Sequence, residues 1–288
     1  MESPKLAMYF NKIEASKVHC YLCPHNCVIN PGKLGACRAR KNIEGNLYSL
    51  NYGKIASIAL DPIEKKPLYH FKPGSKVLSA GTFGCNLKCS FCQNWTIAHA
   101  DTDTCDMTPE SLVSKAKELE HDGNIGIAYT YNEPSIWYEF VYDTARLAKK
   151  AGLSNILVTN GFIGREAMLE LLPYIDAMNI DVKAYTEAFY NDICKGTLEN
   201  VKETVELVAG KCHVEITTLV IPTLNDALPE ISDMAKWISS ISSEIPLHLS
   251  RYFPNYKLQH IPPTPRETLV ECRKEALKYI KYVYLGNV

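Results

Sequence analysis

Short apolar runs alternate with helical patterns along the chain from residue 77 to its end. Each run has the length and composition of a buried strand. Each intervening segment places apolar residues at helical spacing, as Leu112 and Ala116 do in the helix predicted after Thr108. The seven predicted strands are Val77–Ala80, Ile125–Thr130, Asn155–Thr159, Ala177–Val182, Val214–Ile221, Leu247–Arg251 and Tyr282–Leu285.

This alternation predicts an α/β fold built from parallel βαβ units, and seven such strands predict a partial (β/α) barrel. An open, doubly wound sheet is the alternative, and in both architectures ligands bind at the carboxyl ends of the strands. The chain before residue 77 has a different pattern, with turn residues, clustered cysteines and two short strands around Leu47–Leu60. We therefore predict a cysteine-rich N-terminal module over residues 1–76 and a barrel over residues 77–288.

Composition and charge are those of a globular protein. Hydrophobic residues make up 46% of the 288 residues, charged residues 22%, and the net charge is −1. Such a chain is not expected to bind a polyanion or a membrane surface nonspecifically. It begins without an apolar signal sequence and has no apolar run long enough to span a bilayer. We expect a cytoplasmic protein with no membrane partner.

Eleven cysteines change this ordinary picture. Seven of them stand in two tight clusters, and in a reducing compartment such clusters bind metal more often than they form disulfides. The other four are expected to be small buried hydrophobic residues. They are Cys105, Cys194, Cys212 and Cys272.

The first of these clusters, Cys85, Cys89 and Cys92, follows the first predicted barrel strand directly. A zinc site with three ligands is one interpretation, but structural zinc and ferredoxin-type clusters both take four protein ligands. No further cysteine follows at a suitable spacing. An iron with one open position can instead be chelated by a small molecule through an amine and a carboxylate.

The spacing C-x3-C-x2-C after a first barrel strand, with Phe91 before the last cysteine, resembles the radical S-adenosylmethionine (SAM) superfamily. The resemblance implies that the three cysteines hold a 4Fe–4S cluster and that SAM occupies the fourth iron. It also implies that one electron cleaves SAM to a 5′-deoxyadenosyl radical. The electron would come from a donor such as flavodoxin or ferredoxin.

Polar segments after the next strands extend this resemblance. Residues 131–134, Tyr-Asn-Glu-Pro, stand where the superfamily has Gly-Gly-Glu-Pro, which receives the SAM amino group. Thr159-Asn160-Gly161 and Asp181-Val182-Lys183 are similar to segments around the SAM carboxylate and ribose in glycyl-radical activating enzymes. The SAM-binding residues implied are Phe91, Asn132, Glu133, Thr159, Asn160, Asp181 and Lys183.

Each of these segments also has a simpler explanation when it is taken alone. An Asn-Gly after a strand is commonly a turn, an Asp-x-Lys a surface ion pair, and a Glu-Pro the start of a helix. Their joint occurrence at successive strand ends favours the SAM site.

His248 and Arg251 are predicted to lie at the carboxyl end of the sixth strand, on the same edge as the cysteine loop. They are three residues apart, so strand alternation places them on different faces. We expect His248 to face the cavity as a catalytic hydrogen-bond partner of SAM or substrate. We expect Arg251 to bind a carboxylate or phosphate, since its guanidinium fits such groups.

The second cluster contains Cys20, Cys23, Cys27 and Cys37, with glycines that permit tight turns. Four soft thiolates are typical of a closed structural site. Zinc and an auxiliary 4Fe–4S cluster both fit this donor set, and a disulfide pair is the alternative.

A narrower resemblance rests on five segments, residues 20–38, 61–71, 131–134, 248–254 and 282–288. Together they resemble the radical SAM enzymes of the AmmeMemoRadiSam system, which are pyruvate formate-lyase activase-like. The resemblance covers nearly the whole chain and implies the companion proteins of that system as partners. Members usually continue past Gly-Asn-Val, so a chain that stops at Val288 is expected to be truncated or to lack the tail.

The sequence thus predicts a radical SAM enzyme that acts on an unidentified substrate. A glycyl-radical-enzyme activase is the first alternative. A non-catalytic iron–sulfur electron-transfer protein and a zinc-ribbon binding module are others, but neither accounts for the polar residues at the strand ends.

Overall fold

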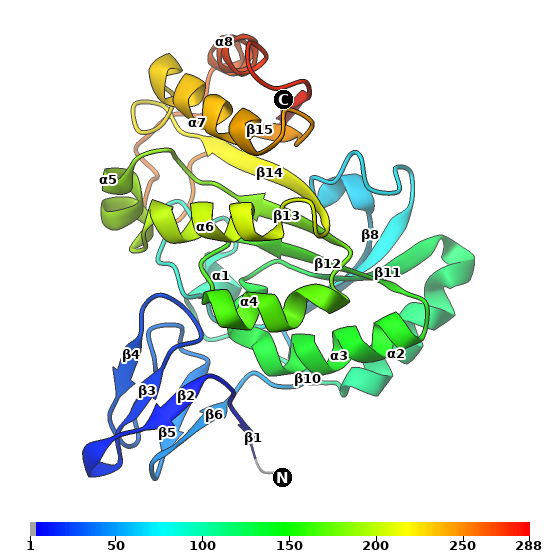
Figure 1. Ribbon diagram of the computed structural model, residues 1–288, viewed down its shortest axis with the longest axis vertical. Coiled ribbons are helices and arrows are strands. Elements are labelled where there is room, and N and C mark those ends of the chain that lie inside the picture. Colours follow the sequence, from blue (N-terminus) through cyan, green and yellow to red (C-terminus); the bar gives the residue numbers. More distant parts are fainter. Residues whose placement is uncertain (1–3) are drawn as a thin grey trace.

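The computed structural model of the chain describes residues 4–288, and its largest element is an eight-stranded open sheet (Figure 1). The strand order is β16-β15-β14-β13-β12-β11-β9-β8, and all neighbours are parallel except β8 and β9. The bounds are β8 (Ser57–Pro62), β9 (Lys76–Gly81), β11 (Asn124–Tyr129), β12 (Ser154–Thr159), β13 (Ala177–Asp181), β14 (His213–Val220), β15 (Leu247–Arg251) and β16 (Val283–Gly286).

The seven predicted barrel strands are confirmed, each within one residue at either end. Their runs are apolar because parallel strands are covered on both faces. The parallel strands lie in sequence order from β9 to β16, without the reversal of order that a doubly wound sheet has, and the sheet does not close between β8 and β16. The predicted partial barrel is therefore confirmed.

Helices connect successive parallel strands, and Figure 1 shows α3, α4 and α6 side by side along one face of the sheet. The helix predicted after Thr108 begins as expected, because the Thr108 side chain accepts a hydrogen bond from the backbone N–H of Ser111. The helices are α1 (Trp95–Ala98), α2 (Pro109–Glu118), α3 (Tyr138–Lys150), α4 (Arg165–Leu171), α5 (Glu187–Phe189), α6 (Leu198–Val208), α7 (Leu228–Ile241) and α8 (Arg266–Ala276).

Strand β8 lies within the range assigned to the N-terminal module, yet it belongs to the large sheet. It pairs antiparallel with β9, from Ser57 opposite Gly81 to Pro62 opposite Lys76. The proposed division at residue 76 therefore separates two paired strands, and the sheet itself begins at residue 57. The sequence signal was weak because β8 is an edge strand that is only partly buried.

The preceding residues form small antiparallel sheets, which Figure 1 shows beside the barrel in blue. One sheet has the order β1-β6-β5 and another the order β2-β3-β4, while β7 pairs with β10. Within residues 4–288 no helix is long and apolar enough to cross a membrane. The bounds are β1 (Lys5–Leu6), β2 (Phe10–Lys12), β3 (Val18–Cys20), β4 (Cys27–Ile29), β5 (Arg40–Ile43), β6 (Asn46–Ser49), β7 (Lys54–Ile55) and β10 (Cys105–Asp106).

Candidate functional site

The loop that follows β9 carries Cys85, Cys89 and Cys92, and all three thiols are free. Asn132 fixes the start of this loop, since its amide nitrogen donates to the carbonyl of Gly84 at 2.9 Å. Its amide oxygen accepts from the N–H of Thr82 at 3.1 Å. The segment after β11 thus positions the cysteine loop through one side chain.

Asn86 and Asn160 connect the cysteine loop to the segment after β12. The Asn160 amide nitrogen lies 2.9 Å from the Asn86 side-chain oxygen and 3.8 Å from the Cys85 sulfur. Asn86 is fully buried and donates to the carbonyl of Phe162 at 2.6 Å. Asn86 was not predicted as a site residue, although it stands next to Cys85 in the sequence.

Backbone hydrogen bonds also fix the middle of the cysteine loop. The N–H of Lys88 donates to the carbonyl of Cys194 at 2.7 Å, and the N–H of Ser90 donates to that of Ile193 at 3.1 Å. This pairing brings the buried Cys194 next to Cys89. Hydrogen bonding to the Cys194 thiol and burial both raise the pKa of the Cys89 thiol.

The four scattered cysteines do not share one environment. Cys194 and Cys272 are buried as expected, Cys212 is partly buried, and Cys105 is exposed. The prediction that all four are buried is therefore wrong for Cys105, which lies on the two-residue strand β10 at the surface.

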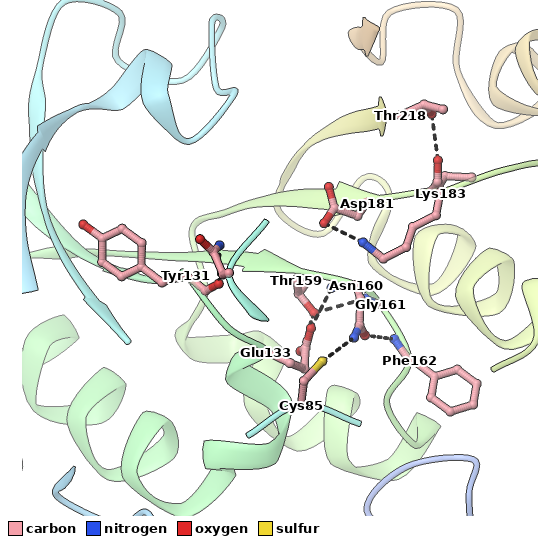
Figure 2. Close-up of polar contacts among 12 residues, drawn as sticks. Cys85, Tyr131, Glu133, Thr159, Asn160, Gly161, Phe162, Asp181, Lys183 and Thr218 are labelled. Atoms are coloured by element: carbon pink, nitrogen blue, oxygen red, sulfur yellow. Dashed lines mark hydrogen bonds and ion pairs between the residues drawn. The ribbon is translucent and has the colours of Figure 1, made fainter. Parts of the chain in front are cut away.

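Glu133 joins the ends of β11 and β12, and Figure 2 shows its carboxylate close to Thr159, Asn160 and Cys85. The carboxylate is buried and accepts from the N–H of Ser135 at 2.9 Å, the Thr159 hydroxyl at 2.7 Å and the N–H of Asn160 at 2.7 Å. Burial raises the pKa of the Glu133 carboxyl, although these hydrogen bonds oppose the shift.

Asp181 and Lys183 lie at the end of β13, where the Lys183 ammonium is 3.0 Å from an Asp181 carboxylate oxygen (Figure 2). The ammonium also lies 5.9 Å from the centre of the Phe91 ring. Burial lowers the pKa of Lys183, but the charges of Asp181 and of the nearby thiol groups raise it well above its usual value. Lys183 is therefore a fixed cation beside the cysteine loop.

The predicted position of His248 at the carboxyl end of β15 is wrong, because it is the second residue of that strand. It is paired with Thr217, which in turn is paired with Asp181, so its side chain lies on the same face of the sheet as Asp181. Its Nε2 lies 2.6 Å from the Glu215 carboxylate rather than in an open cavity, and the residue is buried.

Arg251, the last residue of β15, turns towards the following loop. Its Nε donates to the carbonyl of Thr264 at 2.7 Å, and its guanidinium lies 5.0 Å from the centre of the Phe253 ring. The anion-binding role assigned to Arg251 stays a prediction.

Glu215 forms a buried polar cluster that sequence reasoning missed. Its carboxylate accepts from the N–H groups of Tyr69 and His70 at 3.1 and 2.8 Å, and the rings of His213 and His248 lie at 2.9 and 2.6 Å. Burial raises the pKa of Glu215, but these hydrogen bonds outweigh it and lower the pKa to about 2. Residues 61–71 were singled out in the sequence, and part of that segment covers the inner face of the sheet here.

The N-terminal cysteines come together at the contact between the small sheets and the barrel. Cys20 on β3 is paired with Cys27 on β4, and both line one cavity together with Cys23 and Cys37. All four are free. Among residues 4–288, no group of three or more His, Cys, Asp or Glu side chains is arranged so that it could hold a metal ion.

A sequence model of the Radical SAM superfamily matches residues 80–237. This range covers more than half of the chain and includes the three-cysteine loop and all three polar segments. The chain belongs to the radical SAM superfamily and is an enzyme.

Comparisons with individual proteins show which radical SAM enzymes this chain is similar to. It is 45% identical to the uncharacterized protein MJ0808 of Methanocaldococcus jannaschii, over 98% of this chain and 85% of the relative. It is 26% identical to the pyruvate formate-lyase-activating enzyme of Clostridium pasteurianum, over 69% of this chain and 87% of that enzyme. A structure of TYW1 with a bound lysine–pyruvate adduct matches with a TM-score of 0.53 at 16% identity, over 78% of this chain and 84% of that one. The match to TYW1 shows a similar fold only.

Proposed function

We propose that the enzyme cleaves SAM reductively and uses the resulting radical on a substrate that is still to be identified. One observation carries this proposal. Three free cysteines lie at the carboxyl end of β9, beside polar side chains from the segments that follow β11, β12 and β13. An electron carrier needs the thiols but has no use for these side chains.

The cysteine loop fits a 4Fe–4S cluster with one open iron. Cys85, Cys89 and Cys92 would each hold this cluster through one thiolate. A hydrogen-bond donor also lies beside Cys85, because the Asn160 amide nitrogen is 3.8 Å from its sulfur. Hydrogen bonds of this kind tune the properties of iron–sulfur clusters.

The surrounding residues fit SAM by their charge and by their unused hydrogen-bonding capacity. A carboxylate can accept about four hydrogen bonds, and Glu133 uses three, so it can take one more from the amino group of SAM. Lys183 supplies a positive charge, and the partly exposed Asp181 can accept hydrogen bonds from ribose hydroxyls.

When bound, the cluster supplies the electron that cleaves SAM to a 5′-deoxyadenosyl radical. The residues of the chain bind and orient the reactants and keep water away from them. Glu133 holds Thr159 and Asn160 in place, and Asn132 holds the cysteine loop. Flavodoxin or ferredoxin is the proposed electron donor.

A glycyl-radical-enzyme activase is the second candidate function. The similarity to pyruvate formate-lyase-activating enzymes favours it. Its substrate would be a glycine of a partner protein. The companion proteins of the AmmeMemoRadiSam system are the first candidates to supply either a protein or a small-molecule substrate.

The test is anaerobic reconstitution with iron and sulfide, followed by dithionite and SAM. We expect release of 5′-deoxyadenosine, measured by liquid chromatography and mass spectrometry. The matched control is Cys105→Ala, which removes an exposed cysteine outside the site and should leave the rate unchanged. A reconstituted protein that binds iron but releases no 5′-deoxyadenosine would instead support an electron carrier.

A further inference from the structure

The four N-terminal cysteines reach one cavity from separate parts of the module. Cys20 and Cys27 face each other across paired strands, Cys23 lies in the turn between those strands, and Cys37 precedes β5. Nothing in the SAM site uses these thiols. Their convergence needs an explanation of its own.

Arg40 brings a fixed positive charge to the wall of this cavity. Its side chain is only 1% exposed and donates to the Glu139 carboxylate and to the carbonyl of Met8. Its Nε is buried and has no hydrogen-bond partner. An unpaired buried N–H costs about 1–3 kcal/mol, and a thiolate in the cavity would remove that cost.

We propose that Cys20, Cys23, Cys27 and Cys37 bind a second metal centre through four thiolates, either one zinc ion or one 4Fe–4S cluster. Both centres place negative charge on the sulfurs, and Arg40 stabilises that charge. Metal binding must draw the thiols together, because in the described residues they are not already arranged around an ion. This inference goes beyond the proposed function and does not depend on SAM chemistry.

His25 connects this centre to the cysteine loop of the barrel. It lines the cavity, and its Nε2 lies 2.6 Å from the carbonyl oxygen of Asn86. Its ring packs edge-to-face against Phe162, 5.1 Å between ring centres. His25 is therefore a positioning residue: the metal fixes the turn that carries His25, and His25 holds the peptide next to Cys85.

The test begins with a full-length variant in which Cys85, Cys89 and Cys92 are all alanine. This variant cannot hold the barrel cluster, so failure of the proposed function does not affect the result. After anaerobic purification we expect about one zinc, or about four irons with matching sulfide, per chain. The two metal analyses distinguish the two centres. Finding neither metal would overturn the proposal.

Adding Cys20→Ser and Cys27→Ser to this variant should remove the remaining metal, whereas adding Cys105→Ser should not. Alkylation of the wild-type protein gives an answer even if the multiple variants fold poorly. Cys23 and Cys27 are partly accessible, so chelation should make both react faster, while the exposed Cys105 should react equally before and after. Unchanged rates at Cys23 and Cys27 would contradict the proposal.

A separate measurement tests His25. His25→Ala should weaken retention of iron at the barrel cysteines under a chelator about tenfold, as loss of an outer hydrogen bond does at other metal sites. His25→Gln keeps an N–H donor and should restore most of the retention. Equal retention in wild type and His25→Ala would show that the contact has no positioning role.

Discussion

The two cysteine clusters present the same side chain in different surroundings. The barrel loop presents three thiols at the ends of parallel strands, next to the side chains of Glu133, Asn160 and Lys183. The N-terminal cavity collects four thiols from its own small sheets, and apart from His25 and Arg40 its other walls are apolar or glycine. If both clusters bind metal as proposed, the difference indicates two roles: three thiolates beside polar groups are suited to chemistry, and four thiolates in a mostly apolar cavity are suited to stability.

The largest effect on activity should come from changes in the three-cysteine loop after β9. Replacing any one of Cys85, Cys89 or Cys92 with alanine should reduce 5′-deoxyadenosine release to background, because every iron–sulfur ligand is needed to hold the cluster. The proposed metal at the N-terminal cysteines should remain in each variant. A variant that cleaves SAM at the wild-type rate would remove that cysteine from the site.

A change beside the N-terminal cysteine cavity should alter the stability of the protein rather than its chemistry. Arg40→Met leaves Glu139 as an unpaired charge in a buried position, a change that typically costs about 3–5 kcal/mol. The free energy of unfolding from chemical denaturation measures this loss. The second change Glu139→Leu should recover part of it. If the single variant were as stable as the wild type, the buried pair would not hold the module to the barrel.

The pH dependence of stability tests the polar cluster at Glu215, which is separate from both cysteine clusters. The folded-state pKa of Glu215, about 2, lies below its usual value of 4.5. Its contribution to stability is therefore complete above about pH 4.5 and is lost as the pH falls through 2, amounting to about 3 kcal/mol.

Glu215→Gln should flatten the fall in unfolding free energy between pH 5 and pH 2. The comparison should be made on metal-free protein, since acid also releases metal from thiolates. An unchanged slope would mean that this carboxylate is not held in its ionised form by its four partners.

The smallest effect should appear at Lys183. Lys183→Ala should weaken SAM binding about tenfold, or about 1.4 kcal/mol, through the loss of one charged contact. The absorption spectrum of the cluster should not change. Lys236→Ala, on the exposed side of α7, is the matched control. Equal SAM affinity in both variants would exclude Lys183 from the SAM site.

The sequence predicted the sheet well because each parallel strand is a continuous apolar run between amphipathic helices. It predicted the polar segments as one site because parallel strands direct their carboxyl ends to one edge. It did not reveal the contact between Cys194 and the cysteine loop, or the four partners of Glu215. The Cys194 contact and three of the four partners of Glu215 (Tyr69, His70 and His248) come from segments that are distant in the sequence. The contacts made by backbone N–H groups also leave no pattern of side chains.

The placement of His248 failed for a different reason. The strand containing it was predicted correctly, but His248 stands near its beginning, where the side chain meets Glu215 instead of a ligand. The edge strand β8 shows the same limit, since its half-buried pattern does not say which sheet it joins.

The hydrogen bonds from Lys88 and Ser90 to residues 193 and 194 have a consequence when the enzyme is exposed to oxygen. They join peptide groups and do not depend on iron, so we expect the cysteine loop to keep its shape when the proposed cluster is destroyed. Oxygen damage should then leave an empty but folded cysteine loop rather than an unfolded chain. We expect such an enzyme to regain its cluster from new iron and sulfide once its thiols are reduced, without being synthesised again.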